Sequence, residues 1–322
     1  KGQSPLRIDK YLAEHMAGTS RNRIQTAADA GNIWVNGKAV SSNYKVKPLD
    51  IIQVLLDHEP HDFTILPENI PLTIVYEDDD VLVLNKPAGL VVHPGHGNYE
   101  HTLLNALAFY FQEQHWDMND PSIGLVHRID KDTSGAVVYA RNAEAHKALS
   151  MAFEHRKVEK IYHALVWGRP LWEETSSNKR LLVNGDQRHR TIISRNGKES
   201  VTYFKNLGSC GPYSWIEARP KTGRTHQIRC HLHDMGLSIV CDPLYSGNQK
   251  PVRLSDLKRS WHGDVYEERP LLNRLALHAW KITLPHPQTG EMVTFTAPYS
   301  KDLDATRNQL AKLFKTNPLA EN

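Results

Sequence analysis

Residues 123–140 place groups that can do chemistry between two apolar runs that can hold them in position. The polar centre of this stretch reads HRIDKDTSG, and Asp130 lies there among three basic neighbours: His127, Arg128 and Lys131. Positive neighbours keep a carboxylate ionised, and an ionised carboxylate can act as a nucleophile at a sugar carbon. The alternative is a turn aspartate bonded only to nearby backbone, which is the interpretation we favour for Asp132.

A second polar stretch, KTGRTHQIRCH, covers residues 221–231 and leads into a predicted helix. Gly223 permits a tight turn, and Thr225 is placed to cap the helix that follows. Along that helix, His226 and Arg229 share one face. An arginine on a helix face is usually a solvated charge. Polar residues crowd the start of this helix, however, so Arg229 is also a candidate partner for a distant carboxylate.

Other candidate groups have simpler explanations. Tyr162 lies in an alternating strand pattern, where a core tyrosine is the default interpretation. Residues 31–38 look like a phosphate loop but have the wrong glycine spacing, and a hairpin turn fits them better. The grouped histidines lack a carboxylate or cysteine at a usual ligand spacing, so we predict no metal site at them: His93, His96, His226, His231 and His233.

The elements that must position these residues indicate two domains and a linker. Residues 1–56 read as two short helices, an Asn36-Gly37 hairpin and a further strand, which together make a small module. Residues 57–71 carry three prolines and little periodicity, so we predict a linker. Residues 72–322 mix many strand patterns with few helices, which predicts an α+β domain on a large, mainly antiparallel sheet.

Composition narrows the class of protein. The chain has 322 residues, of which 40% are hydrophobic, and no apolar run approaches the ~20 residues that cross a bilayer. Three cysteines without a paired spacing predict a reducing, cytoplasmic compartment. Residues 1–50 hold eight Lys and Arg against four Asp and Glu, although the net charge of the whole chain is only +3. This local excess is typical of a nucleic-acid contact surface, and equally of an ordinary soluble one.

Taken together, these stretches resemble the RluA/RluD family of RNA pseudouridine synthases. The family pattern His-Arg-Leu-Asp-x-x-Thr-Ser-Gly is similar to residues 127–135, with Ile129 in place of Leu. The pattern Thr-Gly-Arg-(Thr/Ser)-His-Gln-(Ile/Leu)-Arg-x-His matches residues 222–231. Shorter similarities lie at residues 85–89, 241–245, 277–280 and 286–291, and Cys241 stands where the family commonly has Gly. Residues 6–56 resemble the αL module of the small-subunit ribosomal protein S-four.

The resemblance implies a fold and a role for individual residues. It implies the pseudouridine synthase fold, with a central cleft across a large mixed sheet. Asp130 would be the catalytic aspartate, Arg229 would pair with it, and Tyr162 would stack beside the flipped uracil and take part in proton transfer at carbon five. Arg128 would enter the RNA stack. We expect further RNA contacts from basic and imidazole groups in both domains: His127, Arg224, His226, Arg7, Arg21, Arg23 and Lys38.

The same resemblance implies the reaction and its partners. Uridine is isomerised without redox change or group donor, so we expect no cofactor, no metal and no membrane partner. A module of this kind before this catalytic domain is typical of enzymes of large-subunit (23S) ribosomal RNA, and we expect a monomer. Three alternatives stay open: the same chemistry on transfer RNA, a catalytically silent RNA-binding assembly factor, and a metal-dependent nuclease.

Overall fold

The computed structural model describes residues 6–16, 19–55, 65–95, 98–114, 124–188, 190–247 and 250–320. The chain divides into two compact units, Lys1–Thr64 and Ile65–Asn322. Part of the linker expected at 57–71 falls on residues 56–64, which lie outside the described residues. The exact domain bounds stay a prediction.

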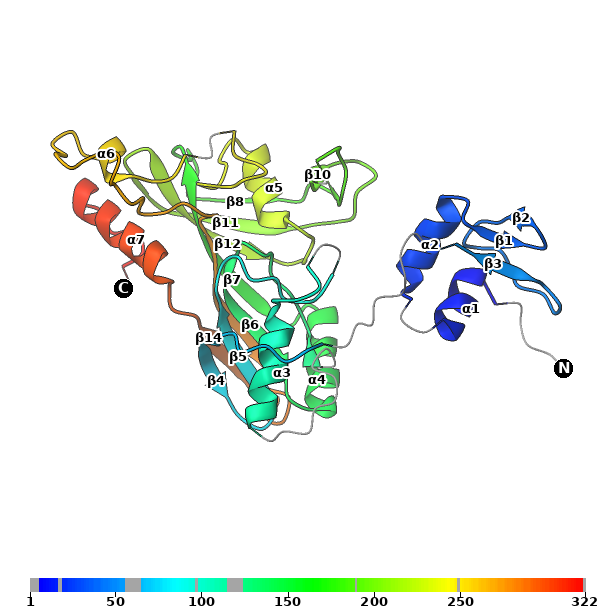
Figure 1. The fold of residues 1–322 in the computed structure, drawn as a ribbon. Helices are drawn as coiled ribbons and strands as arrows, with labels where there is room; N and C mark the ends of the chain where they lie inside the picture. Colours follow the sequence, from blue (N-terminus) through cyan, green and yellow to red (C-terminus); the bar gives the residue numbers. More distant parts are fainter. Residues whose placement is uncertain are drawn as a thin grey trace. The chain divides into compact units, whose positions relative to one another are not determined.

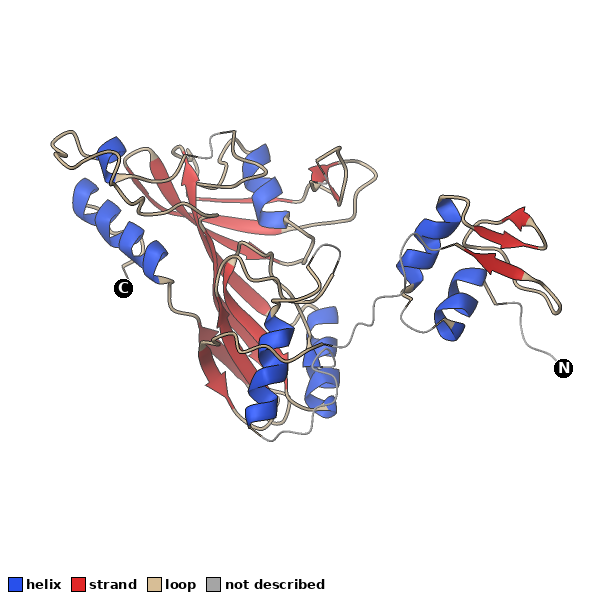
Figure 2. Ribbon diagram, viewed as in Figure 1, coloured by secondary structure: helices blue, strands red, loops and turns tan. Residues whose placement is uncertain are grey.

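The N-terminal unit packs two helices on a three-stranded sheet (Figures 1 and 2). Ser20 caps the second helix by accepting a hydrogen bond from the backbone N–H of Arg23, at 3.3 Å. The expected hairpin forms because Asn36 and Gly37 adopt the positive φ angles, 51° and 76°, that its turn requires. Apolar side chains from both helices and from the sheet make one core. The elements are α1 (Ile8–His15), α2 (Arg21–Asp29), β1 (Ile33–Val35), β2 (Lys38–Ala39) and β3 (Ile52–Val54).

The C-terminal unit is built on a nine-stranded sheet with the order β4-β5-β6-β13-β7-β12-β11-β8, and β14 pairs with β13. Every pairing is antiparallel except the one between β6 and β13. The strands are β4 (Ile74–Glu77), β5 (Val81–Lys86), β6 (Ser134–Ala140), β7 (Glu159–Trp167), β8 (Glu174–Ser177), β11 (Thr202–Cys210), β12 (Tyr213–Pro220), β13 (Leu277–Pro285) and β14 (Met292–Thr296). A separate hairpin pairs β9 (Leu181–Leu182) with β10 (Ile192–Ile193).

Two helices cover opposite faces of the β5–β6 region. Side chains alternate along β5, so Val81 and Val83 join the core cluster of α4 (Ala143–Glu154), whereas Leu82 and Leu84 join that of α3 (Leu103–Glu113). The other end of the sheet has a third core, to which α5 (Gln227–Asp234) and α7 (Lys301–Phe314) contribute. The short helix α6 (Leu254–Leu257) completes the set. Helices α3 and α4 are labelled beside the sheet in Figure 1.

The predicted fold class is confirmed. The residues on either side of the acidic turn at 78–80 form β4 and β5, and an apolar-rich segment after His101 forms α3. Thr102 and Asn105 cap α3 reciprocally, each side chain bonding to the backbone N–H of the other. Residues 173–200 contribute β8 to the main sheet and then form the β9–β10 hairpin. Among the described helices, none combines the length and apolarity needed to span a membrane.

Candidate active site

One row of paired residues runs across the centre of the large sheet and aligns the chemically interesting segments. Gly135 of β6 pairs with Ala279 of β13, Ala279 with Tyr162 of β7, and Tyr162 with Ala218 of β12. The Asp130 loop enters β6 just before this row. Strand β12 ends just after it and leads through residues 221–226 into α5. Asp130 and Arg229, 99 residues apart in sequence, thus lie in the two segments that flank this row.

Gly135 makes the close pairing of β6 and β13 possible. Its φ angle is +116°, and a Cβ atom at this position would lie 2.2 Å from the carbonyl oxygen of Ala279. Only glycine tolerates both conditions. The Thr-Ser-Gly ending of the polar loop is thus the point at which the loop is anchored to the sheet.

Arg229 joins two carboxylates from separate segments. Its Nε and Nη2 atoms donate to the two oxygens of Asp242, each at 2.8 Å. Its Nη1 atom lies 3.5 Å from Oδ2 of Asp130. The side chains of Arg229 and Asp242 are 3% and 0% exposed, whereas that of Asp130 is 21% exposed. The structure thus brings together the two residues that the sequence suggested as partners, and leaves Asp130 open on its other side.

Asp242 was missed from the sequence as a member of this site, although it lies in the segment CDPLY that supported the resemblance. Burial raises its pKa, but the Arg229 guanidinium and the backbone N–H groups of Leu244 and Tyr245 outweigh burial, so the pKa lies below the usual value. Burial works against the charge of Arg229 as well, yet Asp242 and Asp130 raise its pKa overall. Because both ions stay charged, the bidentate pair fixes the direction in which Nη1 points.

Lys86 holds the Asp130 loop through a hydrogen bond to its backbone. Its side chain is buried, and its Nζ donates to three backbone carbonyls, those of Pro87 (2.8 Å), Leu90 (2.7 Å) and Lys131 (2.9 Å). Burial lowers the pKa of Lys86 to about 7, while Asp132 and Asp130 act in the opposite direction. The backbone N–H of Gly89 donates to the same Lys131 carbonyl. Two hydrogen bonds to the Lys131 carbonyl therefore hold the loop.

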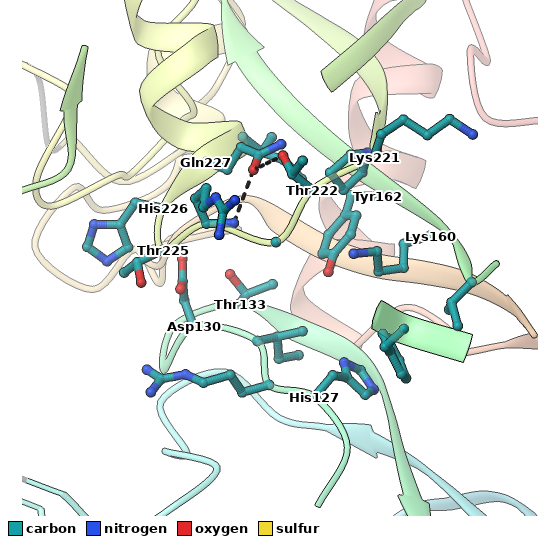
Figure 3. A pocket seen from close by; sticks show the side chains of 18 of the residues that line it. His127, Asp130, Thr133, Lys160, Tyr162, Lys221, Thr222, Thr225, His226 and Gln227 are labelled. Carbon is teal, nitrogen blue, oxygen red and sulfur yellow. Dashed lines mark hydrogen bonds between the residues drawn. The ribbon is translucent and has the colours of Figure 1, made fainter. Parts of the chain in front are cut away.

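A cavity of about 550 Å³ opens beside Asp130 (Figure 3). Its lining includes Asp130, Tyr162, Lys160 and Arg229, and its volume suits one nucleotide unit. Burial, together with the negative charge of Asp130, raises the pKa of Tyr162 above its usual value. Tyr162 is therefore a neutral phenol in the free protein and offers its ring as a wall; its part in proton transfer stays a prediction.

His127 lines the cavity, and its ring is also bonded within the protein. Its Nε2 accepts a hydrogen bond from the backbone N–H of Val138 at 2.8 Å, and its ring stacks on Phe153 at 4.8 Å. Burial, with the nearby charge of Lys160, lowers the pKa of His127 to about 3. This histidine is neutral and ties the polar loop to β6, so it offers no charge to a phosphate.

The start of α5 differs from the sequence prediction. The N-cap residue is His226, with a left-handed φ of 54°, and not Thr225. The turn is held instead by Gln227, whose Oε1 accepts from Thr222 Oγ1 (2.7 Å) and from the backbone N–H of Arg224 (3.1 Å). Burial lowers the pKa of His226. His226 lines the cavity, as its prediction as a contact residue requires.

Cations surround the mouth of the cavity. Arg128 and Arg224, both expected from the sequence, line it, as do Arg156 and Lys221, which were not expected. Arg128, Arg156 and Lys221 are exposed, and Arg224 is half-buried. Arg156 follows α4 in a turn, and no local pattern signals that this turn lies at the cavity. A mouth of this charge favours a polyanion.

The basic residues of the N-terminal unit are partly engaged within it. Arg7 and Arg21 both pair with the buried carboxylate of Asp9, at 3.1 and 3.0 Å, and their side chains remain 42% and 46% exposed. Arg23 is half-buried, and Lys38 is exposed on β2. Arg7 and Arg21 can still reach a phosphate, but Asp9 neutralises part of the positive charge that the composition suggested.

Within the described residues, one cluster has three ligand-type side chains close together: Asp78, Asp80 and His286. The Asp78 carboxylate already accepts hydrogen bonds from the backbone N–H groups of Asp80 and Val81, from the Tyr76 hydroxyl and from the His286 ring. These contacts close the β4–β5 turn, which accounts for the cluster without an ion. His96, one of the histidines weighed as a metal ligand, lies outside the described residues.

Comparison with known proteins finds similarity along nearly the whole chain. A family model described as RNA pseudouridylate synthase matches residues 80–234, and an S4 domain model matches residues 6–52. An uncharacterized RNA pseudouridine synthase of Chlorobaculum parvum is 37% identical over 94% of this chain and 94% of its own length. The ribosomal large subunit pseudouridine synthase D of Neisseria meningitidis serogroup B is 35% identical over 92% of this chain and 76% of its own.

A solved structure of a human protein has a fold similar to that of this chain. The human protein called RNA Pseudouridylate Synthase Domain Containing 1 superposes with a TM-score of 0.53 and 26% identity, covering 82% of this chain and 100% of its own. Segments 127–135 and 222–231, which carry the Asp130–Arg229 pair, both lie inside the residues that the synthase model matches.

Proposed function

This chain belongs to the RNA pseudouridylate synthase family and is an isomerase, and from that premise we propose that it converts uridines of large-subunit ribosomal RNA to pseudouridine with Asp130 as the catalytic carboxylate. The observation that carries the proposal is the Asp130–Arg229 pair, 3.5 Å apart at the edge of a cavity of about 550 Å³. No other carboxylate lining this cavity, among the described residues, touches a buried arginine.

The reaction needs little beyond a positioned carboxylate. The bond from ribose carbon one to uracil nitrogen one breaks, a bond to uracil carbon five forms, a proton leaves carbon five, and nitrogen one gains a proton. Attack on the ribose, attack on the base and glycal-type elimination all begin from the same ionised group. Arg229 holds Asp130 in place, and Tyr162 faces the same space and provides an aromatic wall for the base.

The RNA must bring its uridine out of the stack, at a cost of a few kcal/mol. The cations at the cavity mouth offset that cost through phosphate contacts: Arg128, Arg156, Lys221 and Arg224. We assign the ribosomal substrate from two supports. One is the S4 domain match at residues 6–52, and the other is the set of large-subunit enzymes among the relatives.

The test compares Asp130→Asn with the unmodified protein on a large-subunit ribosomal RNA transcript. We expect the wild-type protein to form pseudouridine and Asp130→Asn to form none, while the dissociation constants for RNA stay within about threefold. Asp132→Asn is the matched control, because Asp132 lies in the same loop but does not line the cavity. Pseudouridine is mapped in the RNA after reaction. Turnover by Asp130→Asn would refute the role of Asp130, and modification of transfer RNA alone would refute the substrate.

A further inference from the structure

Lys160 is the interior cation that the arrangement around Asp130 leaves unused. It lies on β7 two residues before Tyr162, so both side chains project from the same face of the strand, about 6.5 Å apart along it. Both line the cavity. Figure 3 shows the Lys160 amine beside Tyr162.

The amine of Lys160 has no protein partner among the described residues: neither a hydrogen bond nor a salt bridge reaches Nζ. A Cβ atom at Gly223 would lie 3.9 Å from this Nζ, so the amine lies close to the turn that follows β12, the strand paired with β7. Burial lowers the pKa of Lys160, and no carboxylate offsets that effect. Lys86 makes the contrast, because its amine has three carbonyl partners. A half-buried amine without a partner is costly unless a ligand supplies one.

RNA can offer Lys160 either a phosphate oxygen or a carbonyl oxygen of the base, and the position of Lys160 favours the base. Phosphates follow the RNA backbone, which stays at the mouth, where Arg128, Arg156 and Lys221 are exposed. Lys160 is half-buried, and its amine lies beside Tyr162, the aromatic side chain that faces the base. The acceptor that a base stacked on Tyr162 brings to this amine is a carbonyl oxygen of uracil.

The geometry points to Lys160 as the residue that binds the uracil oxygen farthest from the ribose, and so distinguishes uracil from cytosine. The inference rests on the proposed function. In uridine, carbon four lies opposite the nitrogen that carries the ribose, so the far oxygen is O4. Cytosine carries an amino group there, and a lysine amine is a donor that cannot pair with another donor.

The same contact serves the base before and after it turns. In pseudouridine the ribose is attached to carbon five, and the ring atom opposite carbon five is carbon two. The far oxygen is then O2, in the place that O4 held. Lys160 therefore holds the far edge of the ring in both substrate and product, while the bond at the near edge is exchanged beside Asp130.

The experiment measures how the enzyme responds to a weaker acceptor at carbon four. Single-turnover rates are determined for the wild-type protein, Lys160→Met and Lys157→Met, on transcripts made with uridine or with 4-thiouridine. Products are separated by chromatography of the digested RNA. Lys157→Met is the control, since Lys157 is exposed on the same approach to β7 and does not line the cavity.

We expect the sulfur substitution to slow the wild-type protein and Lys157→Met by about tenfold. We expect Lys160→Met to be about 30-fold slower than the wild type on uridine RNA. Sulfur at carbon four should slow this variant by less than a further factor of about two, because the contact between Lys160 and O4 is already lost. The sulfur effect is a ratio of two rates for the same protein preparation, so an inactive fraction of that preparation does not change it. An equal sulfur effect in Lys160→Met and the wild type would overturn the inference. A wild-type protein that leaves uridine RNA unmodified would instead refute the proposed function.

Discussion

The guanidinium of Arg229 is fixed to Asp242 by two hydrogen bonds of 2.8 Å, and its remaining nitrogen lies 3.5 Å from Asp130. The pair with Asp242 is almost fully buried, and the contact with Asp130 is not. Asp242 therefore orients the Arg229 guanidinium, and Arg229 in turn orients the Asp130 carboxylate that faces the cavity.

Asp242→Asn should loosen this arrangement without touching the RNA. Removing one charge of a buried pair leaves the other uncompensated, so we expect the unfolding free energy to fall by about 3 kcal/mol. We also expect the single-turnover rate to fall by about 30-fold as Asp130 loses its fixed orientation. Urea unfolding and rate measurements on the same preparations check both effects. A normal rate would show that Arg229 needs no second carboxylate.

Gly135→Ala should separate β6 from β13. The added Cβ would lie 2.2 Å from the Ala279 carbonyl oxygen, at a φ of +116°. Strain and clash together should cost more than about 3 kcal/mol and should remove activity. Gly290→Ala is the matched control, because Gly290 also has a positive φ, 71°, but no atom within 4 Å of an added Cβ. It should cost about 1 kcal/mol. Equal losses in the two variants would contradict the close-approach argument.

Lys221→Ala should weaken RNA binding mainly at low salt. Each phosphate contact that is lost reduces the slope of log affinity against log salt by about 0.7 to 0.9. The measurement is RNA binding over a range of salt concentrations. Lys147→Ala, on the exposed face of α4 and away from the cavity, should leave the slope unchanged. An unchanged slope in Lys221→Ala would remove Lys221 from the RNA-binding surface.

His278 should make the protein less stable in weak acid. Its Nε2 donates to the Ala297 carbonyl and its Nδ1 accepts from Ser134, so both nitrogens are used by the neutral ring. Burial lowers its pKa to about 4, and Arg274 adds to this against the opposing Ala297 carbonyl. Between pH 6.5 and 4 the unfolded chain binds a proton that the folded one does not, so stability falls as pH falls through this range.

The expected loss from His278 alone is about 2 kcal/mol between pH 7 and pH 5. Urea unfolding at several pH values measures it. His278→Gln should be less stable at pH 7 but should show a flatter pH dependence, because the titrating group is gone. An identical slope in the variant would assign the acid sensitivity to other groups.

The sequence predicted the fold class and the two residues of the central ion pair, Asp130 and Arg229. It did not predict the residue that orients Arg229. The polar loop at Asp130 and the helix at Arg229 each carry a local pattern, so both could be found by reading along the chain. Asp242 carries no such pattern, because its partner is set by tertiary packing. No local pattern marks Lys160 either, and only the pairing of β7 with β13 and β12 places it in a cavity.

His127 differs from the sequence prediction in its charge. We counted it among the positive neighbours of Asp130, but its Nε2 accepts a hydrogen bond from the backbone N–H of Val138 and burial keeps the ring neutral. The electrostatic state of a side chain depends on its burial and partners, which a linear sequence does not display.

The position of β13 has a consequence for how the enzyme comes into being. This strand, Leu277–Pro285, is near the end of the chain, yet it lies between β6 and β7 in the middle of the sheet. During synthesis the Asp130 loop and Tyr162 leave the ribosome long before the strand that separates and aligns them. The Asp130 loop and Tyr162 therefore cannot be aligned on one sheet until residues 277–285 have been made and have paired with β6 and β7.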